Sequence, residues 1–166
     1  MSALPRPAIG FVPTPADAIA AMTALAQLTP ADLVYDLGCG DGRLLVQAAV
    51  DYGVRGVGID VDGALLDRAR RKADQAGVGD RLSFVQADLF ETDLHAATVV
   101  FIYLLPHFNL RLRPRLQHQL RPGSRLITHM FDMGDWAPDI TLPLEGSEEE
   151  SVIYLWRLPR PYKQGV

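Results

Sequence analysis

The 166-residue sequence has one cysteine, no long apolar run and no excess of basic side chains. A single cysteine cannot form a disulfide within the chain, which excludes a disulfide-rich secreted domain and favours a reducing compartment. The longest apolar run, Val99 to Pro106, is far too short to cross a bilayer, and the first residues lack the pattern of a secretion signal. These absences predict a cytoplasmic protein that does not insert into a membrane.

The charge balance argues against a generally basic protein. The chain has 16 lysines and arginines against 20 aspartates and glutamates, a formal net charge of −4, so no overall basic field attracts nucleic acid. A chain of this length buries about 70% of its unfolded surface as one unit, so we expect residues 1–166 to form a single domain. The composition does not predict the oligomeric state.

Three glycines stand at alternating positions directly after an apolar run: Gly38, Gly40 and Gly42. An amphipathic run begins at Leu44, so the order predicts a strand, a tight turn and a helix. Open α/β sheets use this arrangement to hold a small ligand at the carboxyl ends of their strands. The spacing G-x-G-x-G is not the dinucleotide fingerprint G-x-G-x-x-G, and no P-loop lysine follows it, which disfavours an NAD-dependent oxidoreductase.

Two carboxylates accompany this turn in the sequence. Asp36 lies two residues before the first glycine, and Asp60 ends the next apolar strand, where a carboxylate can accept two hydrogen bonds from a ribose diol. A glycine turn with an acid before it and an acid after the second strand resembles the class I S-adenosylmethionine (SAM) methyltransferases. The resemblance implies SAM as the cofactor and S-adenosylhomocysteine as its product.

Strand and helix patterns alternate along the chain. Five strands are predicted at 32–37, 55–60, 82–86, 98–103 and 125–131. Two further strands, 140–144 and 151–158, are predicted to form a closing antiparallel hairpin around an acidic loop. Because βαβ crossovers require a parallel sheet, the predicted fold class is α/β, with a Rossmann-like, mostly parallel sheet in three αβα layers.

Four helices are predicted, at 15–28, 42–52, 63–75 and from Pro114 onwards. Thr14, Asp41 and Asp62 stand where N-cap residues are favoured, and Pro114 is expected to break any helix that begins before it. No strand is predicted before the first helix. We therefore expect residues 1–30 to form an extension and a helix that packs over the sheet edge and covers the cofactor site.

Longer segments narrow the resemblance within the seven-stranded SAM-dependent methyltransferases, whose sheet order is 3-2-1-4-5-7-6. The chain is most similar to small protein lysine methyltransferases, which include archaeal broad-specificity enzymes and mitochondrial enzymes that methylate the ATP synthase c subunit. The similarity is carried by Phe11 to Pro15, Val34 to Arg43, Gly58 to Asp60, Tyr103 to Leu105, Leu120 to Gly123, and Trp136 with Pro138. It implies a protein substrate that presents a lysine.

The resemblance also implies roles for the motif residues. Asp36, Gly38 and Gly40 would line the methionine end of SAM, and Asp60 would hold the ribose hydroxyls. The cofactor-binding set would also include Cys39, Val61 and Tyr103. Asp88 would receive the adenine amino group and Leu89 or Phe90 would pack on the ring. Thr14 and Tyr103 would flank the transferred methyl group as the catalytic residues. A metal ion is not implied, and the four histidines show no metal-ligand spacing.

Methyl transfer from a sulfonium depends on geometry more than on acid–base chemistry. For a lysine acceptor with a pKa near 10.4, deprotonation at pH 7 costs roughly 4.6 kcal/mol. A neighbouring SAM cation lowers the lysine pKa, so no dedicated base is expected. We hypothesise that Tyr103 orients the acceptor nitrogen through its hydroxyl group.

The residues after the fourth strand bear on the alternatives to a lysine acceptor. The segment from Tyr103 to Pro106 lacks the Asn/Asp-Pro-Pro-Tyr/Phe with which enzymes grip a flipped base, so nucleic-acid methylation is disfavoured. Methylation of a small metabolite and SAM binding without catalysis both stay open. Cys39 is interpreted as packing rather than as a nucleophile. A structural role is favoured for His129 over a role at the acceptor site. The arginines between 111 and 125 are interpreted as ordinary surface in preference to a site for a phosphate or an acidic partner. Trp136 fits an acceptor channel and a core cap equally well.

Overall fold

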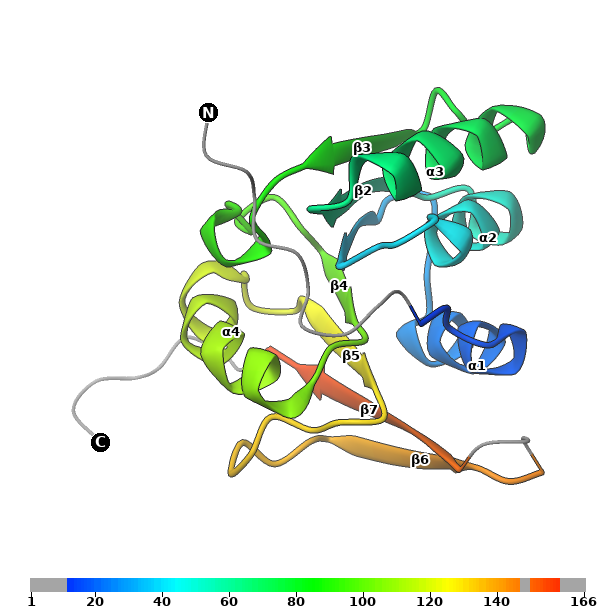
Figure 1. Cartoon of the computed structure of the whole chain (residues 1–166). Helices are drawn as coiled ribbons and strands as arrows, with labels where there is room; N and C mark the ends of the chain where they lie inside the picture. The colour runs from blue at the N-terminus through cyan, green and yellow to red at the C-terminus, as the bar shows by residue number, and fades with distance from the viewer. Residues whose placement is uncertain (1–11, 147–149, 159–166) are drawn as a thin grey trace.

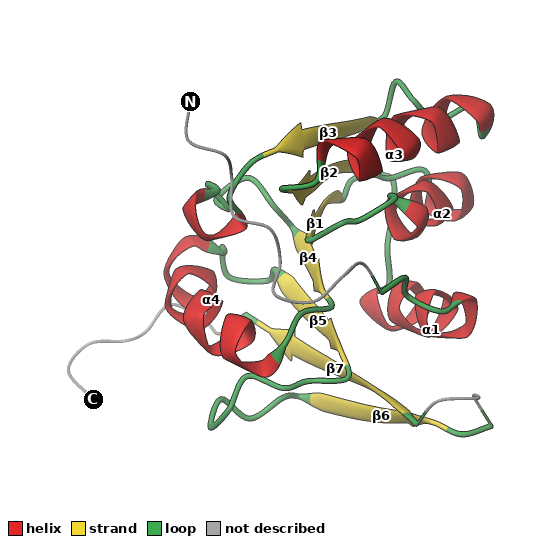
Figure 2. Ribbon diagram, viewed as in Figure 1, coloured by secondary structure: helices red, strands yellow, loops and turns green. Residues whose placement is uncertain are grey.

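The computed structural model of the chain describes residues 12–146 and 150–158 (Figures 1 and 2). Its helices are α1 (Ala16–Ala26), α2 (Arg43–Tyr52), α3 (Gly63–Gln75) and α4 (Pro106–Gln119), with a 3-10 turn, η1 (Leu89–Glu91). Its strands are β1 (Leu33–Leu37), β2 (Arg55–Asp60), β3 (Leu82–Gln86), β4 (Val99–Ile102), β5 (Arg125–His129), β6 (Ile140–Leu144) and β7 (Ser151–Arg157). The predictions for residues 1–11 and for 147–149 of the acidic loop lie outside the described residues.

The strands form one sheet in the order β3-β2-β1-β4-β5-β7-β6. The strands β1 to β5 pair in parallel, whereas β7 pairs antiparallel with both β5 and β6. The predicted α/β fold, the mostly parallel sheet, the closing hairpin and the strand order are therefore confirmed. The largest difference in a strand boundary is at β5, which ends at His129 rather than at residue 131.

The register brings the carboxyl ends of neighbouring strands to one level. Leu37 at the end of β1 lies opposite Ile59 of β2 and Ile102 of β4. Strand β7 runs in the opposite direction, so its first residue, Ser151, reaches the same edge of the sheet. The loops after β1, β2 and β4 therefore converge there, where open α/β sheets hold their ligands.

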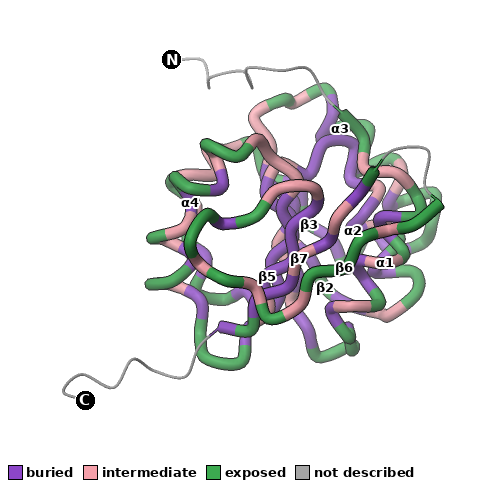
Figure 3. The backbone as a smooth tube through the Cα atoms, turned by 90° about the horizontal axis from the view of Figure 1, so that it is seen from below, coloured by how far each residue is buried: buried purple, intermediate pink, exposed green. Residues whose placement is uncertain are grey.

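Two apolar cores lie on opposite faces of the sheet. Helices α1, α2 and α3 cover one face, where Leu45 and Leu66 are fully buried. Helix α4 covers the other face with Leu112 and Leu116. Figure 3 shows the strands as a largely buried layer between more exposed surfaces. The predicted three-layer arrangement is confirmed.

Helix α1 occupies a different place from the one predicted. It packs against β5 and β7 and beside α2, instead of over a sheet edge. Residues 130–139, which connect β5 to β6 and are all described, contain no helix, so Ile127, Ile153 and Leu155 on this face would be exposed without α1. The apolar side of α1, which includes Ile19 and Met22, covers them.

Two of the three predicted N-caps are wrong. Helix α1 begins one residue later than predicted, with Pro15 as its N-cap, so Thr14 lies outside the helix. Helix α2 has Gly42 as its N-cap, in the left-handed conformation with φ 78°, and the Asp41 carboxylate binds other side chains. The third cap is confirmed, because the Asp62 carboxylate accepts hydrogen bonds from two N–H groups of the first turn of α3.

Pro114 does not break helix α4, contrary to the prediction. The helix runs continuously through it from Pro106, which occupies its first turn. Pro114 cannot donate to the carbonyl of Leu110, but Leu110 lies on a water-exposed side of the helix, 47% exposed. Burial of Leu112 and Leu116 on the other side offsets a local cost of about 3 kcal/mol.

A polar network connects the strands at the opposite, amino edge of the sheet. The buried Asp32 carboxylate forms an ion pair with Arg125 and accepts a hydrogen bond of 2.8 Å from the Thr98 hydroxyl. The N–H of Leu33 donates to the same hydroxyl oxygen at 3.0 Å. The network therefore joins the beginnings of β1, β4 and β5.

Replacing Thr98 with valine is expected to lower the free energy of unfolding by about 1–3 kcal/mol, because Asp32 and the Leu33 N–H each lose a partner in a partly buried setting. The affinity for S-adenosylhomocysteine should stay within about 2-fold, since the network lies at the far edge of the sheet. Urea unfolding and calorimetric titration measure the two quantities. A Thr98→Ser control keeps the hydroxyl and should lose less stability; equal midpoints for wild type and Thr98→Val would contradict the assignment.

Candidate active site

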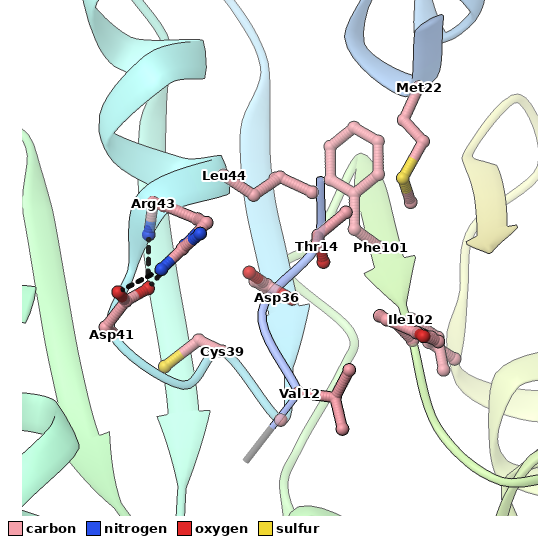
Figure 4. A pocket seen from close by; sticks show the side chains of 12 residues that line it. Val12, Thr14, Met22, Asp36, Cys39, Asp41, Arg43, Leu44, Phe101 and Ile102 are labelled. Atoms are coloured by element: carbon pink, nitrogen blue, oxygen red, sulfur yellow. Dashed lines mark hydrogen bonds and ion pairs between the residues drawn. The ribbon is translucent and has the colours of Figure 1, made fainter. Parts of the chain in front are cut away.

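A pocket opens at the carboxyl ends of β1 and β4 (Figure 4). It is lined by Val12, Thr14, Met22, Asp36, Gly38, Cys39, Asp41, Arg43, Leu44, Phe101, Ile102 and Tyr103. These residues come from the segment before α1, from α1 itself, from the end of β1, from the glycine turn with the start of α2, and from the end of β4. Five predicted site residues are thereby brought together: Thr14, Asp36, Gly38, Cys39 and Tyr103.

The backbone of the glycine turn leaves no room for a side chain at Gly38 or at Gly42. Gly38, Gly40 and Gly42 have φ values of 78°, 57° and 78°, in the region that favours glycine. A Cβ on Gly38 would lie 2.9 Å from the Leu104 side chain, and one on Gly42 would lie 2.7 Å from Ala69 of α3. The turn therefore presents bare main chain to the pocket and packs directly on α3 behind it.

Hydrogen bonds connect the turn to the end of β2. The N–H groups of Gly38 and Cys39 both donate to a carbonyl of β2, at 2.8 and 3.0 Å. The N–H of Gly40 donates to Oδ2 of Asp60 at 2.8 Å, and that of Asp62 donates to Oδ1 at 2.9 Å. A carboxylate has about four acceptor positions, so Asp60 retains capacity for a ribose diol.

Asp36 lines the pocket with its carboxylate, and the residue is only 7% exposed. Burial, and then the negative charges of Asp60 and Asp41, raise the pKa of Asp36 to about 7. Its ionised form would be stabilised by a positive or hydrogen-bond-donating ligand. The electrostatics of the pocket thus favour a cation at this position.

Asp41 is the centre of an ion network. Its side chain is 1% exposed and forms ion pairs with Arg43, at 2.8 Å, and with Lys72 of α3. The Arg43 guanidinium donates through Nε and Nη2, at 3.0 and 2.8 Å (Figure 4). Burial alone would raise the pKa of Asp41, but hydrogen bonds and charge from both cations hold it well below its usual range. The Lys72 side chain is 38% exposed, but its ammonium group reaches back from α3 to this buried carboxylate.

The remaining predicted cofactor residues extend the site along β2 and β3. The N–H of Ala87 donates to the carbonyl of Asp60 at 3.1 Å, so Asp88 follows directly beside the end of β2. Val61 and Leu89 follow the same two strand ends, and none of Val61, Asp88 and Leu89 lines the pocket. Their adenosine-binding roles stay predictions.

The carboxylates at the strand ends and the glycine turn fit SAM as a ligand. The ligand presents positive charge, a diol and an adenine amino group. The protein presents the carboxylates of Asp36, Asp60 and Asp88 at the ends of three adjacent strands, beside a turn that has glycine at every second position. When bound, SAM supplies a methyl group activated by its sulfonium; Asp36 would face the methionine part and Asp60 the ribose.

The two residues predicted to flank the methyl group line the same pocket as Asp36. Tyr103 follows β4 and Thr14 precedes α1, and both are half-buried in the pocket wall. The Tyr103 ring packs edge-on against His129, with the ring centroids 4.4 Å apart. Their catalytic roles stay predictions.

Several lining residues were missed by sequence reasoning. Phe101 and Ile102 immediately precede Tyr103, and Arg43 immediately follows the glycine turn, so adjacency to a motif could have found them. Met22 carried no such signal. It has the pattern of a core residue and reaches the pocket only because α1 packs over β5 and β7.

The structure also shows the surroundings of Cys39, Trp136 and His129, for which the sequence allowed more than one role. Cys39 is a buried free cysteine whose pKa is raised by burial and by nearby carboxylates, which agrees with a packing role. The Trp136 carbonyl accepts a hydrogen bond from Trp156 Nε1 at 2.8 Å and the two rings pack together, so Trp136 caps the core rather than lining the pocket. His129 is buried and hydrogen-bonded to Ser151, at 3.1 Å.

The strand order, the glycine turn and the carboxylates at three strand ends define the class of protein: a SAM-dependent methyltransferase. Comparison with known sequences narrows the class. The profile of the family described as ANTKMT methyltransferase domain matches residues 36–140. The chain belongs to this family.

Curated relatives include lysine methyltransferases from archaea and animals. A protein-lysine N-methyltransferase of Saccharolobus islandicus is 36% identical over 151 residues, which cover 90% of this chain and 94% of that protein. The human lysine N-methyltransferase of the ATP synthase c subunit is 29% identical over 82% of this chain. The alignment spans only 58% of the human protein's length.

A solved structure supports the cofactor. A crystal structure from Salinibacter ruber, described as an RNA methyltransferase in complex with S-adenosylhomocysteine, is 47% identical to this chain, with a TM-score of 0.86. The match covers 93% of this chain and 98% of that chain. SAM is therefore the cofactor of the present protein.

Proposed function

We propose that the protein transfers a methyl group from SAM to the ε-amino group of a lysine in a protein substrate. The similarity along nearly its whole length to the archaeal protein-lysine N-methyltransferase carries this proposal. The electrostatics of the pocket support it. Its two aspartates are Asp36 and Asp41, Asp60 lies beside the turn, and the cation Arg43 is paired with Asp41. A cationic or amine acceptor suits such surroundings.

RNA is the second candidate acceptor, because the Salinibacter ruber relative is described as an RNA methyltransferase. RNA binding requires cations that can contact phosphates. Five arginines in α4, in the segment after it and at the start of β5 are already engaged with protein groups: Arg111 with the Phe90 ring, Arg113 with Asp135, Arg115 with the Thr92 carbonyl, Arg121 with the His95 carbonyl and Arg125 with Asp32. This engagement favours a protein acceptor over a polyanion.

The protein would accelerate methyl transfer mainly by positioning the acceptor nitrogen relative to the methyl group. Holding the acceptor nitrogen and the methyl carbon about 3–3.5 Å apart in line can supply roughly 7–11 kcal/mol of the barrier. Tyr103 and Thr14 line the pocket together with Asp36 and Gly38, and we infer that the acceptor arrives at this part of its wall. The half-buried pocket would also lower the pKa of an entering lysine, which favours the neutral amine.

Replacing Tyr103 with phenylalanine is expected to lower kcat by about 10- to 100-fold, since the hydroxyl that orients the acceptor nitrogen is lost while the ring is kept. The dissociation constant of S-adenosylhomocysteine should change by less than about 2-fold, because the carboxylates at the strand ends are untouched. Steady-state kinetics and calorimetric titration test the two statements. Full kcat with an unchanged KM would exclude the orienting role.

The acceptor class can be identified by transfer of labelled methyl from SAM to fractionated lysate proteins, RNA and small molecules. An Asp60→Ala variant, which removes the carboxylate bound to the glycine turn, serves as the inactive control. We expect base-stable label in protein that maps to lysine by mass spectrometry.

Other outcomes of this experiment decide against the proposal. Label confined to RNA would assign the function described for the Salinibacter ruber relative. Label confined to small molecules would indicate a metabolite methyltransferase. Absence of label from all three fractions, with S-adenosylhomocysteine still bound, would indicate a binding protein without catalysis.

We also propose that residues 1–166 act as one methyltransferase domain in the cytoplasm, with residues 1–30 covering the cofactor site. Val12, Thr14 and Met22 in the pocket wall support the covering role. The free, buried Cys39 agrees with a reducing compartment. Within residues 12–146 and 150–158 no helix is long and apolar enough to cross a membrane.

A further inference from the structure

Three polar side chains meet behind the acceptor wall of the pocket. Tyr103 follows β4, His129 ends β5, and Ser151 begins β7. Because Ile102 pairs with Thr128, Tyr103 and His129 are neighbours across the sheet and lie on the same face. The antiparallel direction of β7 brings Ser151 to this edge as well.

The His129 ring contacts both of the other side chains. Its centroid lies 4.4 Å from that of Tyr103, at an interplanar angle of 64°, and its Nε2 lies 3.1 Å from the Ser151 hydroxyl oxygen. His129 is 1% exposed and Ser151 is 3% exposed. An edge-on aromatic contact contributes about 0.5–1.5 kcal/mol beyond burial and restricts the orientation of both rings.

Packing alone does not explain an imidazole at this position. The second ring nitrogen of His129, Nδ1, is buried without a hydrogen-bond partner, which costs about 1–3 kcal/mol. An apolar ring would fill the space without that cost. What the imidazole adds is the bond to Ser151, which sets the rotation of the ring that Tyr103 touches.

Hydrogen bonds also fix the backbone around and after His129. Met130 has a φ of 73°, unusual for a residue other than glycine. Its N–H donates to the Val152 carbonyl at 2.8 Å, and the Thr128 hydroxyl donates to the Phe131 carbonyl at 2.7 Å. Non-glycine residues keep such conformations where surrounding bonds over-determine them, and these sites concentrate near functional centres.

We propose that His129 is a positioning residue for methyl transfer: oriented by Ser151, its ring holds the phenol of Tyr103 in the position that receives the acceptor nitrogen. The inference rests on the proposed role of Tyr103 at the acceptor side. It assigns no proton transfer to His129. Asp17 is the charged group that acts on the imidazole; burial lowers the His129 pKa and Asp17 opposes that shift, so the ring is neutral at pH 7.

Two variants separate positioning from simple stability. Ser151→Ala removes the bond that orients the imidazole, and His129→Leu removes the ring itself. Ser124→Ala is the matched control, since Ser124 is also a buried serine but lies immediately before β5, at the amino edge of the sheet. We expect both test variants to lower kcat by about 5- to 30-fold, with the acceptor KM and the S-adenosylhomocysteine Kd within about 2-fold of wild type. Ser124→Ala should leave all three unchanged.

A second readout needs neither substrate nor cofactor. In ligand-free protein labelled with ¹³C-tyrosine, the Tyr103 ring resonances are assigned by their loss in Tyr103→Phe. They should shift or broaden in Ser151→Ala and in His129→Leu but not in Ser124→Ala, because only the first two disturb the ring contact. Unshifted Tyr103 resonances in both test variants would overturn the inference whatever the acceptor is.

The two readouts also separate this inference from the proposed function. If label enters RNA or a small molecule, the lysine proposal fails, and the kinetics are repeated on that acceptor while the free-protein spectra stand. Shifted Tyr103 resonances with an unchanged kcat on the true acceptor would show a contact without a positioning role. The assignment is supported only if the two test variants both lower kcat and shift or broaden the Tyr103 resonances.

Discussion

Replacing Asp36 with asparagine is expected to stabilise the ligand-free protein at pH 8 and to weaken SAM binding by about 100-fold or more. The carboxyl group is 7% exposed, and burial followed by the charges of Asp60 and Asp41 raises its pKa from 3.8 to about 7. A pKa change of one unit corresponds to about 1.4 kcal/mol, so keeping Asp36 ionised in the free protein costs about 4 kcal/mol. Asparagine removes this cost and also removes the negative charge that suits the cofactor.

The sign of the pH dependence follows from the raised pKa. Folded protein keeps the Asp36 proton where unfolded protein has lost it, so the stability that this group contributes is full below about pH 4 and is lost as the pH rises to about 7. Relative to Asp36→Asn, the wild type should therefore become less stable between pH 5 and 8. SAM affinity should change in the opposite direction and tighten as Asp36 ionises through about pH 7.

Urea unfolding between pH 5 and 8, with calorimetric titration of SAM at each pH, measures both effects. Asp51→Asn is the matched control, because it makes the same substitution at an exposed position on α2. It should follow the wild type in both experiments. A lower stability of Asp36→Asn than of wild type at pH 8 would contradict the assignment of a strained carboxylate.

Replacing Asp41 with asparagine is expected to lower the free energy of unfolding by about 3 kcal/mol. Its buried carboxylate forms ion pairs with both Arg43 and Lys72, and the three side chains connect the glycine turn to α3. Lys72→Met should cost only about 1 kcal/mol, since Arg43 still pairs with Asp41 and the Lys72 side chain is 38% exposed. The turn also presents the cofactor site, so Asp41→Asn should weaken S-adenosylhomocysteine binding by about 10-fold.

The pH dependence of Asp41 has the opposite sign to that of Asp36. Hydrogen bonds and charge from Arg43 and Lys72 overcome burial and hold the pKa of Asp41 well below its usual range, so its stabilising effect is present above about pH 4 and fades in more acidic solution. The gap between wild type and Asp41→Asn should therefore narrow as the pH falls below about 4. A double-mutant cycle with Lys72→Met measures the coupling; strictly additive effects would show that Lys72 and Asp41 do not interact in solution.

Where sequence-based predictions failed, a distant partner outweighed a local preference. Asp41 stands in a favoured capping position, but Arg43 and Lys72 compete for its carboxylate and Gly42 takes the cap. Pro114 normally ends a helix, yet α4 continues because its apolar side is buried on the sheet. The contact of Lys72 with Asp41 and the contact of α4 with the sheet both join segments far apart in the sequence, so a short stretch of sequence does not reveal them.

The sequence by itself determined the order of strands and helices, the glycine turn, the carboxylates at the strand ends and the class of cofactor. Each of these depends on short-range periodicity, on glycine spacing or on a family resemblance carried by contiguous motifs. Only the tertiary structure decided that Met22 reaches the pocket, that Lys72 pairs with Asp41, that Asp36 has a raised pKa and that His129 packs on Tyr103. These features depend on burial and on distances of a few ångströms between segments far apart in the chain, which strand register and helix packing set.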